Sequence, residues 1–155
     1  MRRAYLSLGT NIGNRYEHLA SAIPVVVGTD EHRLSLVYET EPVGGVAQDD
    51  FWNLVVELMT EASAYELLER ARLAEARAGR TREIRWGPRT LDVDVLLVGD
   101  EELSDPELTI PHPRLYERAF ILVPLAELAP DLVSTEQLAH AVGAVRELGT
   151  LQSLH

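Results

Sequence analysis

The 155-residue sequence contains no cysteine and no lysine, and each absence excludes a kind of chemistry. Without cysteine the chain has no disulfide, no thiolate nucleophile and no cysteine-rich zinc site. Without lysine it has no Schiff-base chemistry and no P-loop lysine. All 14 basic residues are therefore arginine.

Long apolar runs and a broad positive charge are also missing. No apolar stretch approaches the roughly 18 residues that cross a bilayer, and nothing resembles a signal peptide, so we expect a cytoplasmic protein with no membrane partner. The net charge of −11 disfavours a nucleic-acid partner, because binding to a phosphate backbone needs a broad basic face. The length and the 46% hydrophobic content predict a single globular domain over residues 1–155.

A pair of carboxylates stands at the start of the clearest apolar run. Residues 85–94 read RWGPRTLDVD, and residues 95–98 continue as VLLV. This composition predicts a strand, in which Asp92 and Asp94 point to the same face because strand side chains alternate. Mg²⁺ prefers carboxylate oxygens and often uses one or two of them together with substrate phosphates. A solvated loop edge is the alternative interpretation.

Arginines gather just before this pair, although the protein as a whole is acidic. Guanidinium groups bind phosphate in a bidentate manner, so the combination predicts a site for a metal ion and a polyphosphate. A solvated run of charge is again the alternative. The clustered residues are Arg77, Arg80, Arg82, Arg85 and Arg89.

The order of apolar patterns predicts an α+β fold. Asn14 is expected to cap a first helix that Pro24 ends or kinks, and a second helix is expected over residues 63–78. When the expected strands are added to these two helices, the order of elements along the chain is βαββαβ. This order fits a ferredoxin-like antiparallel sheet with helices packed on one face. The expected strands span residues 4–8, 34–40, 52–60 and 93–98, the last of them central.

Further elements are expected to be appended to this core. Asp105-Pro106 predicts a small hairpin, and residues 119–129 predict a helix. The last 25 residues are expected to form another helix and an indifferent tail, with their packing and role left open. The loop over residues 41–51 is long for a hairpin, and such loops are often functional.

Two motifs carry a resemblance to a known family. Residues 85–94 resemble the signature of the hydroxymethyldihydropterin pyrophosphokinases of folate biosynthesis, and PHPRLYERAF at residues 111–120 resembles a second motif of that family. The resemblance covers roughly residues 4–131. It implies the ferredoxin-like core, ATP as co-substrate, two Mg²⁺ ions, and transfer of pyrophosphate to 6-hydroxymethyl-7,8-dihydropterin with release of AMP. It implies small-molecule substrates and no obligate protein partner.

The resemblance also implies roles for individual residues. Asp92 and Asp94 would bind both metal ions, and whether Asp94 also accepts a proton stays open. The residues expected to contact phosphates are Arg80, Arg82 and Arg89, in a loop that closes over ATP and also contains Trp86. The other residues expected to hold the nucleotide are Arg72, Glu75, Thr109, His112 and Arg118. The residues expected to bind the pterin, together with Trp86, are Thr40, Val43, Phe51, Asn53 and Phe120.

Other interpretations remain open. Each phenylalanine taken alone is more often a residue of a hydrophobic core, and residues spaced like Arg72 and Glu75 are usually just neighbours on a helix surface. A different Mg²⁺-dependent phosphotransferase or phosphohydrolase would use the same groups. A ferredoxin-like RNA-binding module is a third possibility, against which the acidity of the chain argues.

Overall fold

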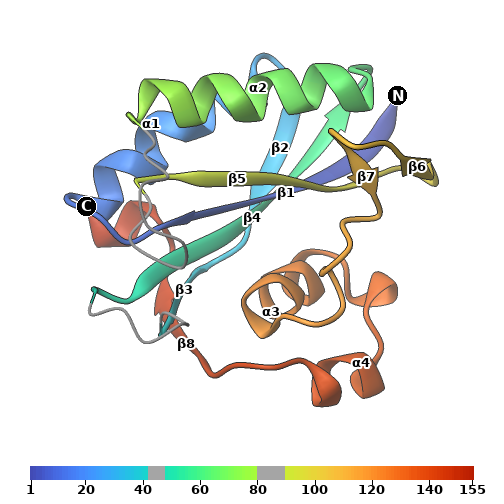
Figure 1. The fold of residues 1–155 in the computed structure, drawn as a ribbon. Coiled ribbons are helices and arrows are strands. Elements are labelled where there is room, and N and C mark those ends of the chain that lie inside the picture. Colours follow the sequence, from blue (N-terminus) through green and yellow to red (C-terminus); the bar gives the residue numbers. More distant parts are fainter. Residues whose placement is uncertain (42–47, 80–89) are drawn as a thin grey trace.

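A single antiparallel sheet forms the centre of the protein (Figure 1). The computed structural model describes residues 1–41, 48–79 and 90–155. The strands lie in the order β5-β1-β4-β3-β8, and β2 pairs with another part of the long strand β4. The six strands of this sheet are β1 (Arg2–Thr10), β2 (Glu31–Leu34), β3 (Val37–Thr40), β4 (Phe51–Thr60), β5 (Asp92–Val98) and β8 (Val145–Gly149).

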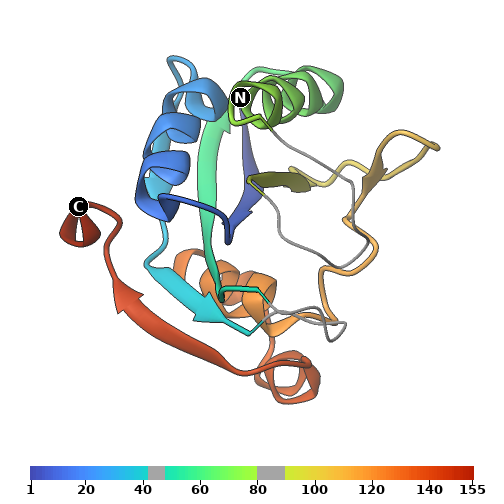
Figure 2. The ribbon, with the colours of Figure 1, turned by 60° about the vertical axis from the view of Figure 1, so that its left-hand side comes forward.

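Helices cover both faces of the sheet (Figures 1 and 2). Helices α1 (Arg15–Val27) and α2 (Ala64–Arg77) lie on one face, and α3 (Ala119–Leu128) lies on the other beside the short α4 (Thr135–His140). The small hairpin is formed by β6 (Leu103–Ser104) and β7 (Thr109–Ile110), and the 3₁₀ turns are η1 (Pro130–Leu132) and η2 (Gln152–Leu154). An antiparallel sheet with helices, an appended hairpin and a helix after residue 118 are confirmed.

Alternation along the strands creates two hydrophobic cores. In β1 and β4, Leu6, Leu8 and Leu54 point towards α1 and α2 and are essentially buried. Tyr5 and Val55, their neighbours in sequence, point to the opposite face and pack with α3. Because both faces are covered, the central strands read as nearly continuous apolar runs, which is why the sequence revealed them.

The predicted cap at Asn14 is confirmed, and of the two effects predicted for Pro24, an end or a kink, the end does not occur. The Asn14 side chain accepts a hydrogen bond from the Glu17 N–H, and Ser63 does the same for Glu66 N–H. Helix α1 does not end at Pro24, because it continues to Val27.

Three expectations about the strands need correction. The segment 34–40 is divided between β2 and β3, because Ser35 leaves the strand path and exchanges two hydrogen bonds of 2.9 Å with the Val55 backbone. Strand β5 lies at the edge of the sheet rather than at its centre. The segment after α4, expected to be an indifferent tail, contains β8, which pairs with β3; its half-exposed, polar sequence gave no apolar pattern to detect.

A charged network joins the sheet to α3. Glu57 on β4 is only 7% exposed, and its carboxylate accepts hydrogen bonds of 2.8 and 3.0 Å from Arg33 and of 2.8 Å from the Tyr5 hydroxyl. Arg33 also donates to the carbonyl of Leu128 at the end of α3. The hydrogen bonds from Arg33 lower the pKa of Glu57, against the opposing effect of burial. Burial and the Glu57 carboxylate raise the pKa of Tyr5.

No helix in the described ranges is both long and apolar enough to span a bilayer.

Glu57→Gln is expected to lower the free energy of unfolding at pH 7 by about 1–3 kcal/mol, because the substitution leaves the buried Tyr5 hydroxyl and the Arg33 guanidinium without a charged acceptor. The lowered pKa means that the carboxylate's contribution is complete above its unfolded value of about 4.3 and is lost as the pH falls through the folded-state value. The difference between the two proteins, measured by urea unfolding, should therefore shrink between pH 7 and pH 3. Glu31→Gln, at an exposed strand carboxylate, is the control. A difference that does not change with pH would contradict this role.

Candidate active site

One row of paired residues crosses the sheet on its α3-facing side. Gly9 of β1 lies opposite Asn53 of β4 on one side and opposite Asp92 of β5 on the other. Asn53 in turn lies opposite Tyr38 of β3. Neighbouring strands are about 4.8 Å apart, so Asn53 and Asp92 stand about 10 Å apart with a glycine between them. The row therefore has a polar side chain on either side, from Asn53 and Asp92, and no side chain at Gly9 between them.

Asn53 is held in one orientation by its neighbours. It is 5% exposed, and its Nδ2 donates a 2.9 Å hydrogen bond to the Thr40 hydroxyl. A Cβ atom at Gly9 would lie 2.7 Å from Asn53 Oδ1, which is closer than real contacts allow. Gly9 is therefore required by close approach and not merely by a turn. Sequence reasoning missed this residue, although a glycine inside a strand pattern is a known sign of close approach.

The two aspartates stand on the exposed part of the edge strand. Asp92 and Asp94 are half-buried and alternate with the buried residues Val93 and Val95. Asp94 lies opposite Ser7 of β1. The Glu75 carboxylate, from α2, accepts a 3.0 Å hydrogen bond from the Val93 N–H between the two aspartates. Glu75 thereby occupies a backbone donor of the edge strand and fixes the segment that carries both aspartates.

His112 lies close to the second aspartate. Its Nε2 is 3.9 Å from Asp94 Oδ1, and its Nδ1 accepts a 3.2 Å hydrogen bond from the Arg114 N–H. Burial lowers the pKa of His112, Asp94 opposes this effect, and Arg118 and Arg114 add to it. The lowered pKa favours the neutral imidazole, and the hydrogen bond accepted by Nδ1 leaves the proton on Nε2, available to an acceptor on the side of Asp94.

A pocket of about 240 Å³ lies beside this edge of the sheet. Among the residues that line it are Asp94, Thr109 and His112, which come from β5, from β7 and from the connection to α3. The structure thus brings together three of the residues that the sequence assigned to the metal or the nucleotide.

Arg118 begins the helix that faces this side of the sheet. Its guanidinium lies 5.5 Å from the centre of the Phe120 ring. Burial lowers its pKa, Arg114 acts in the same direction, and Asp94 and Asp92 oppose them. The positive charge of Arg118 therefore interacts electrostatically with both aspartates. Phe120 is half-buried and packs against the hydrophobic core under α3.

The remaining sequence-predicted residues have different outcomes. Phe51, the first residue of β4, is half-buried and lies opposite Thr40. Arg72 is exposed on α2, nearly one turn before Glu75. Five predicted residues lie outside the described ranges: Val43, Arg80, Arg82, Trp86 and Arg89.

The residues present suit a hard cation. Asp92 and Asp94 offer carboxylate oxygens on the same face of one strand, about 7 Å apart along it. Within residues 1–41, 48–79 and 90–155, no group of three or more metal-binding side chains gathers. Two carboxylates nevertheless fit Mg²⁺, which commonly takes its other ligands from water and substrate phosphates.

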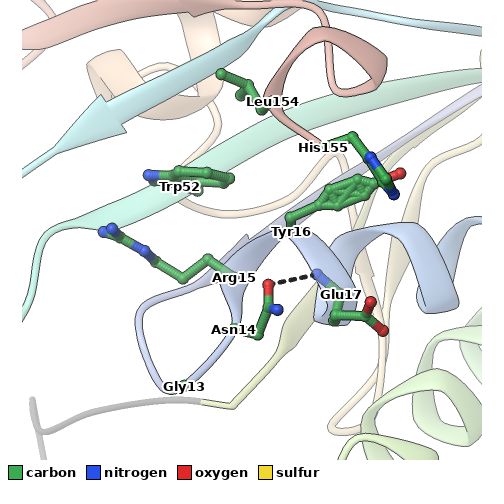
Figure 3. A pocket seen from close by; sticks show the side chains of 8 residues that line it. All are labelled: Gly13, Asn14, Arg15, Tyr16, Glu17, Trp52, Leu154 and His155. Atoms are coloured by element: carbon green, nitrogen blue, oxygen red, sulfur yellow. Dashed lines mark hydrogen bonds between the residues drawn. The ribbon is translucent and has the colours of Figure 1, made fainter.

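A larger pocket, of about 410 Å³, lies elsewhere (Figure 3). It is lined by the start of α1, by Trp52 and by the C-terminal residues Leu154 and His155. Trp52 points to the face opposite Asn53 because the two are adjacent in β4, and it packs with the α1–α2 core. The larger of these two pockets therefore lies on the face of the sheet opposite Asn53 and is not the candidate active site.

Comparisons with known proteins agree with the motifs. The family model for 7,8-dihydro-6-hydroxymethylpterin-pyrophosphokinase matches residues 5–130. The chain is 45% identical to the 2-amino-4-hydroxy-6-hydroxymethyldihydropteridine pyrophosphokinase of Bacillus subtilis over 83% of this chain and 79% of that protein. It is 48% identical to the enzyme of the same name from Methylorubrum extorquens over 86% of each.

A solved structure shares the fold. The crystal structure of Plasmodium falciparum HPPK-DHPS with SDX-DHP matches with a TM-score of 0.63 and 17% identity. The match covers 99% of this chain and 43% of that longer one. Family model, relatives and fold lead to one conclusion: this chain is a member of the 7,8-dihydro-6-hydroxymethylpterin-pyrophosphokinase family, and it is a pyrophosphokinase.

Proposed function

We propose that this pyrophosphokinase transfers the pyrophosphoryl group of ATP to the hydroxymethyl group of 6-hydroxymethyl-7,8-dihydropterin in folate biosynthesis. The hydroxyl oxygen attacks the β-phosphorus and its proton is released, the bond from that phosphorus to the α-phosphate oxygen breaks, and AMP leaves. The row from Asn53 through Gly9 to Asp92 is the observation that supports this assignment best. Its two polar sides are about 10 Å apart, which suits a flat heterocycle at one side and a phosphate chain at the other.

Asn53 is the residue that we propose forms hydrogen bonds with the polar edge of the pterin ring. A primary amide offers one acceptor and two donor hydrogens, which matches the amino-oxo edge of a pterin. Because one amide hydrogen is used by Thr40, the orientation of the group is fixed before the substrate arrives. Phe51 and Phe120 are the proposed surfaces for stacking, and Thr40 and Val43 the proposed wall, although Val43 lies outside the described residues.

Asp92 and Asp94 are the proposed ligands of two Mg²⁺ ions. When bound, the ions would offset the charge that develops on the phosphate oxygens and lower the pKa of the attacking hydroxyl. The neutral His112 would donate from Nε2 to a phosphate oxygen, and Arg118 would supply a fixed positive charge. Glu75 would keep the aspartates in place by holding the backbone between them.

Further nucleotide contacts are proposed from the family resemblance. Thr109 lies in the pocket that Asp94 and His112 share, which supports its assignment. Arg72 would reach the nucleotide from α2. Four residues of the proposed phosphate-binding loop, Arg80, Arg82, Trp86 and Arg89, lie outside the described residues and keep the roles that the sequence predicts.

The fold is also proposed to have a ferredoxin-like core within a single domain. The strand order β5-β1-β4-β3, with α1 after β1 and α2 after β4, supports a βαββαβ core in which β2 and β3 together take one strand position. Strand β8, the hairpin, α3 and α4 are additions to it.

The first test is to measure AMP formation from ATP and Mg²⁺ with and without 6-hydroxymethyl-7,8-dihydropterin. We expect AMP only when the pterin is present, loss of the reaction with EDTA, and recovery with excess Mg²⁺, because the carboxylate pair needs a cation to engage phosphates. A folded protein that binds ATP but forms no pterin-dependent AMP would overturn the proposed function.

Asp92→Asn and Asp94→Asn should each lower kcat by about 100-fold or more, equivalent to about 2.7 kcal/mol of transition-state stabilisation. The urea midpoint should stay close to that of the unmodified protein, since neither side chain is part of a hydrophobic core. Asp100→Asn, just beyond the other end of β5 and exposed, is the matched control. Rates near normal in either site variant would remove the proposed metal ligands.

Asn53→Ala should raise the KM for the pterin by about 5–150-fold, the equivalent of about 1–3 kcal/mol for an unpaired polar edge, and leave the KM for ATP within about twofold. Gly9→Ala should act in the same direction, because the new methyl group displaces the Asn53 amide. Asn14→Ala, which removes a helix cap, is the control and should affect stability without a pterin-specific effect. Equal losses for both substrates would contradict the assignment of Asn53.

A further inference from the structure

A cluster of charged and aromatic side chains lies behind the proposed pterin subsite, on the other face of β3 and β4. It consists of Arg15, Glu39, Trp52 and Arg146, and we call it the rear cluster. Glu39 directly precedes Thr40, and Trp52 directly precedes Asn53. Because side chains alternate along a strand, these pairs of neighbours point to opposite faces. The rear cluster and the proposed pterin residues therefore share one stretch of backbone.

Glu39 is the centre of the rear cluster. Its side chain is 15% exposed, and Trp52 lies opposite it on β4. On the other side, Arg146 of β8 is its partner in the strand register and forms a salt bridge with its carboxylate. Arg15 places a second guanidinium 3.9 Å from the other carboxylate oxygen. A mostly buried carboxylate is thus flanked by two positive charges.

Arg15 connects this carboxylate to the start of β4. Its guanidinium lies 4.8 Å from the centre of the Trp52 ring (Figure 3) and donates a 2.8 Å hydrogen bond to the carbonyl of Asp50. Asp50 directly precedes Phe51. The rear cluster therefore fixes the last residues of β3 and the first residues of β4, where Thr40, Phe51 and Asn53 stand on the other face.

Arg146 comes from a part of the chain that the family model does not match. That match ends at residue 130, whereas β8 begins at Val145 and pairs with Thr40 at the very end of β3. The Arg146 side chain is 71% exposed and lies on the face of the sheet opposite Thr40 and Asn53, so its influence on the pterin passes through Glu39 and the strand.

We propose that Arg146 is a positioning residue for the pterin subsite, acting through Glu39 on the strand ends that carry Thr40 and Asn53. The salt bridge neutralises Glu39, keeps β8 in register against β3 and so holds the hydroxyl of Thr40 where it receives the Asn53 amide. This proposal rests on the pterin subsite assigned under the proposed function. It makes a segment beyond the family match a determinant of pterin affinity.

Arg146→Gln tests the proposal through steady-state kinetics with each substrate varied in turn. The KM for the pterin should rise roughly fivefold, which corresponds to about 1 kcal/mol. The KM for ATP and kcat should stay within about twofold, because the aspartate pair lies at the other edge of the sheet. Glu39→Gln should raise the pterin KM similarly, and the double variant should show no more than the larger single effect, as expected for two residues that act as a pair.

Arg2→Gln is the matched control. Arg2 forms a salt bridge of 2.9 Å with Glu101, also partly exposed, beside the turn that follows β5. This variant loses a comparable ion pair and should leave both KM values unchanged. A loss of general stability would lower activity towards both substrates in the two arginine variants alike, which the split between the two KM values separates from positioning.

Asn53→Ala, measured in the same series, distinguishes the two ways of failing. If Asn53→Ala raises the pterin KM and Arg146→Gln leaves it within twofold, or raises both KM values equally, the role of Arg146 is overturned and the subsite stands. If Asn53→Ala has no effect on the pterin KM, the subsite itself is wrong, and the proposal for Arg146 is overturned with it.

Discussion

The pairing of β1 with two neighbours at once is the constraint on which the site depends. Gly9 is the point where the register with β4 and the register with β5 meet, so that Asn53 and Asp92 share one row. A shift of one residue in either pairing would turn the corresponding polar group into the hydrophobic core of the opposite face. The leucines of β1 and β4 prevent such a shift, because they are buried only in the observed register. The apolar core thus sets the spacing of the polar row.

Much of the fold could be predicted because local signals and burial agree. The helix caps at Asn14 and Ser63, and the apolar runs of the central strands, follow directly from side-chain chemistry. The division at Ser35 could not be predicted, since it depends on hydrogen bonds to Val55, a residue distant in sequence. Strand β8 was missed for a related reason: it is half-exposed and gains its structure from the free edge of β3 rather than from its own pattern.

The candidate site divides in the same way. The aspartates and His112 were visible as motifs, and the structure brings His112 within 3.9 Å of Asp94. Glu75 was expected near the nucleotide, but its hydrogen bond to Val93 could only be seen once α2 had been placed against β5. The contribution of Gly9 was hidden because a missing side chain leaves no signal of its own, and only the distance to Asn53 reveals it.

Strand β8 also bears on when the protein can finish folding. Arg146 and Glu39 are 107 residues apart in sequence, so the wall behind the pterin side is completed by a segment that is synthesised after all the proposed substrate-binding residues. Until residues 145–149 have left the ribosome, β3 presents an unpaired edge, and such edges recruit other strands. Contacts of this sequence separation also form slowly. A nascent chain that already contains every proposed substrate-binding residue would therefore still lack a finished sheet, with an unpaired strand edge beside the pterin.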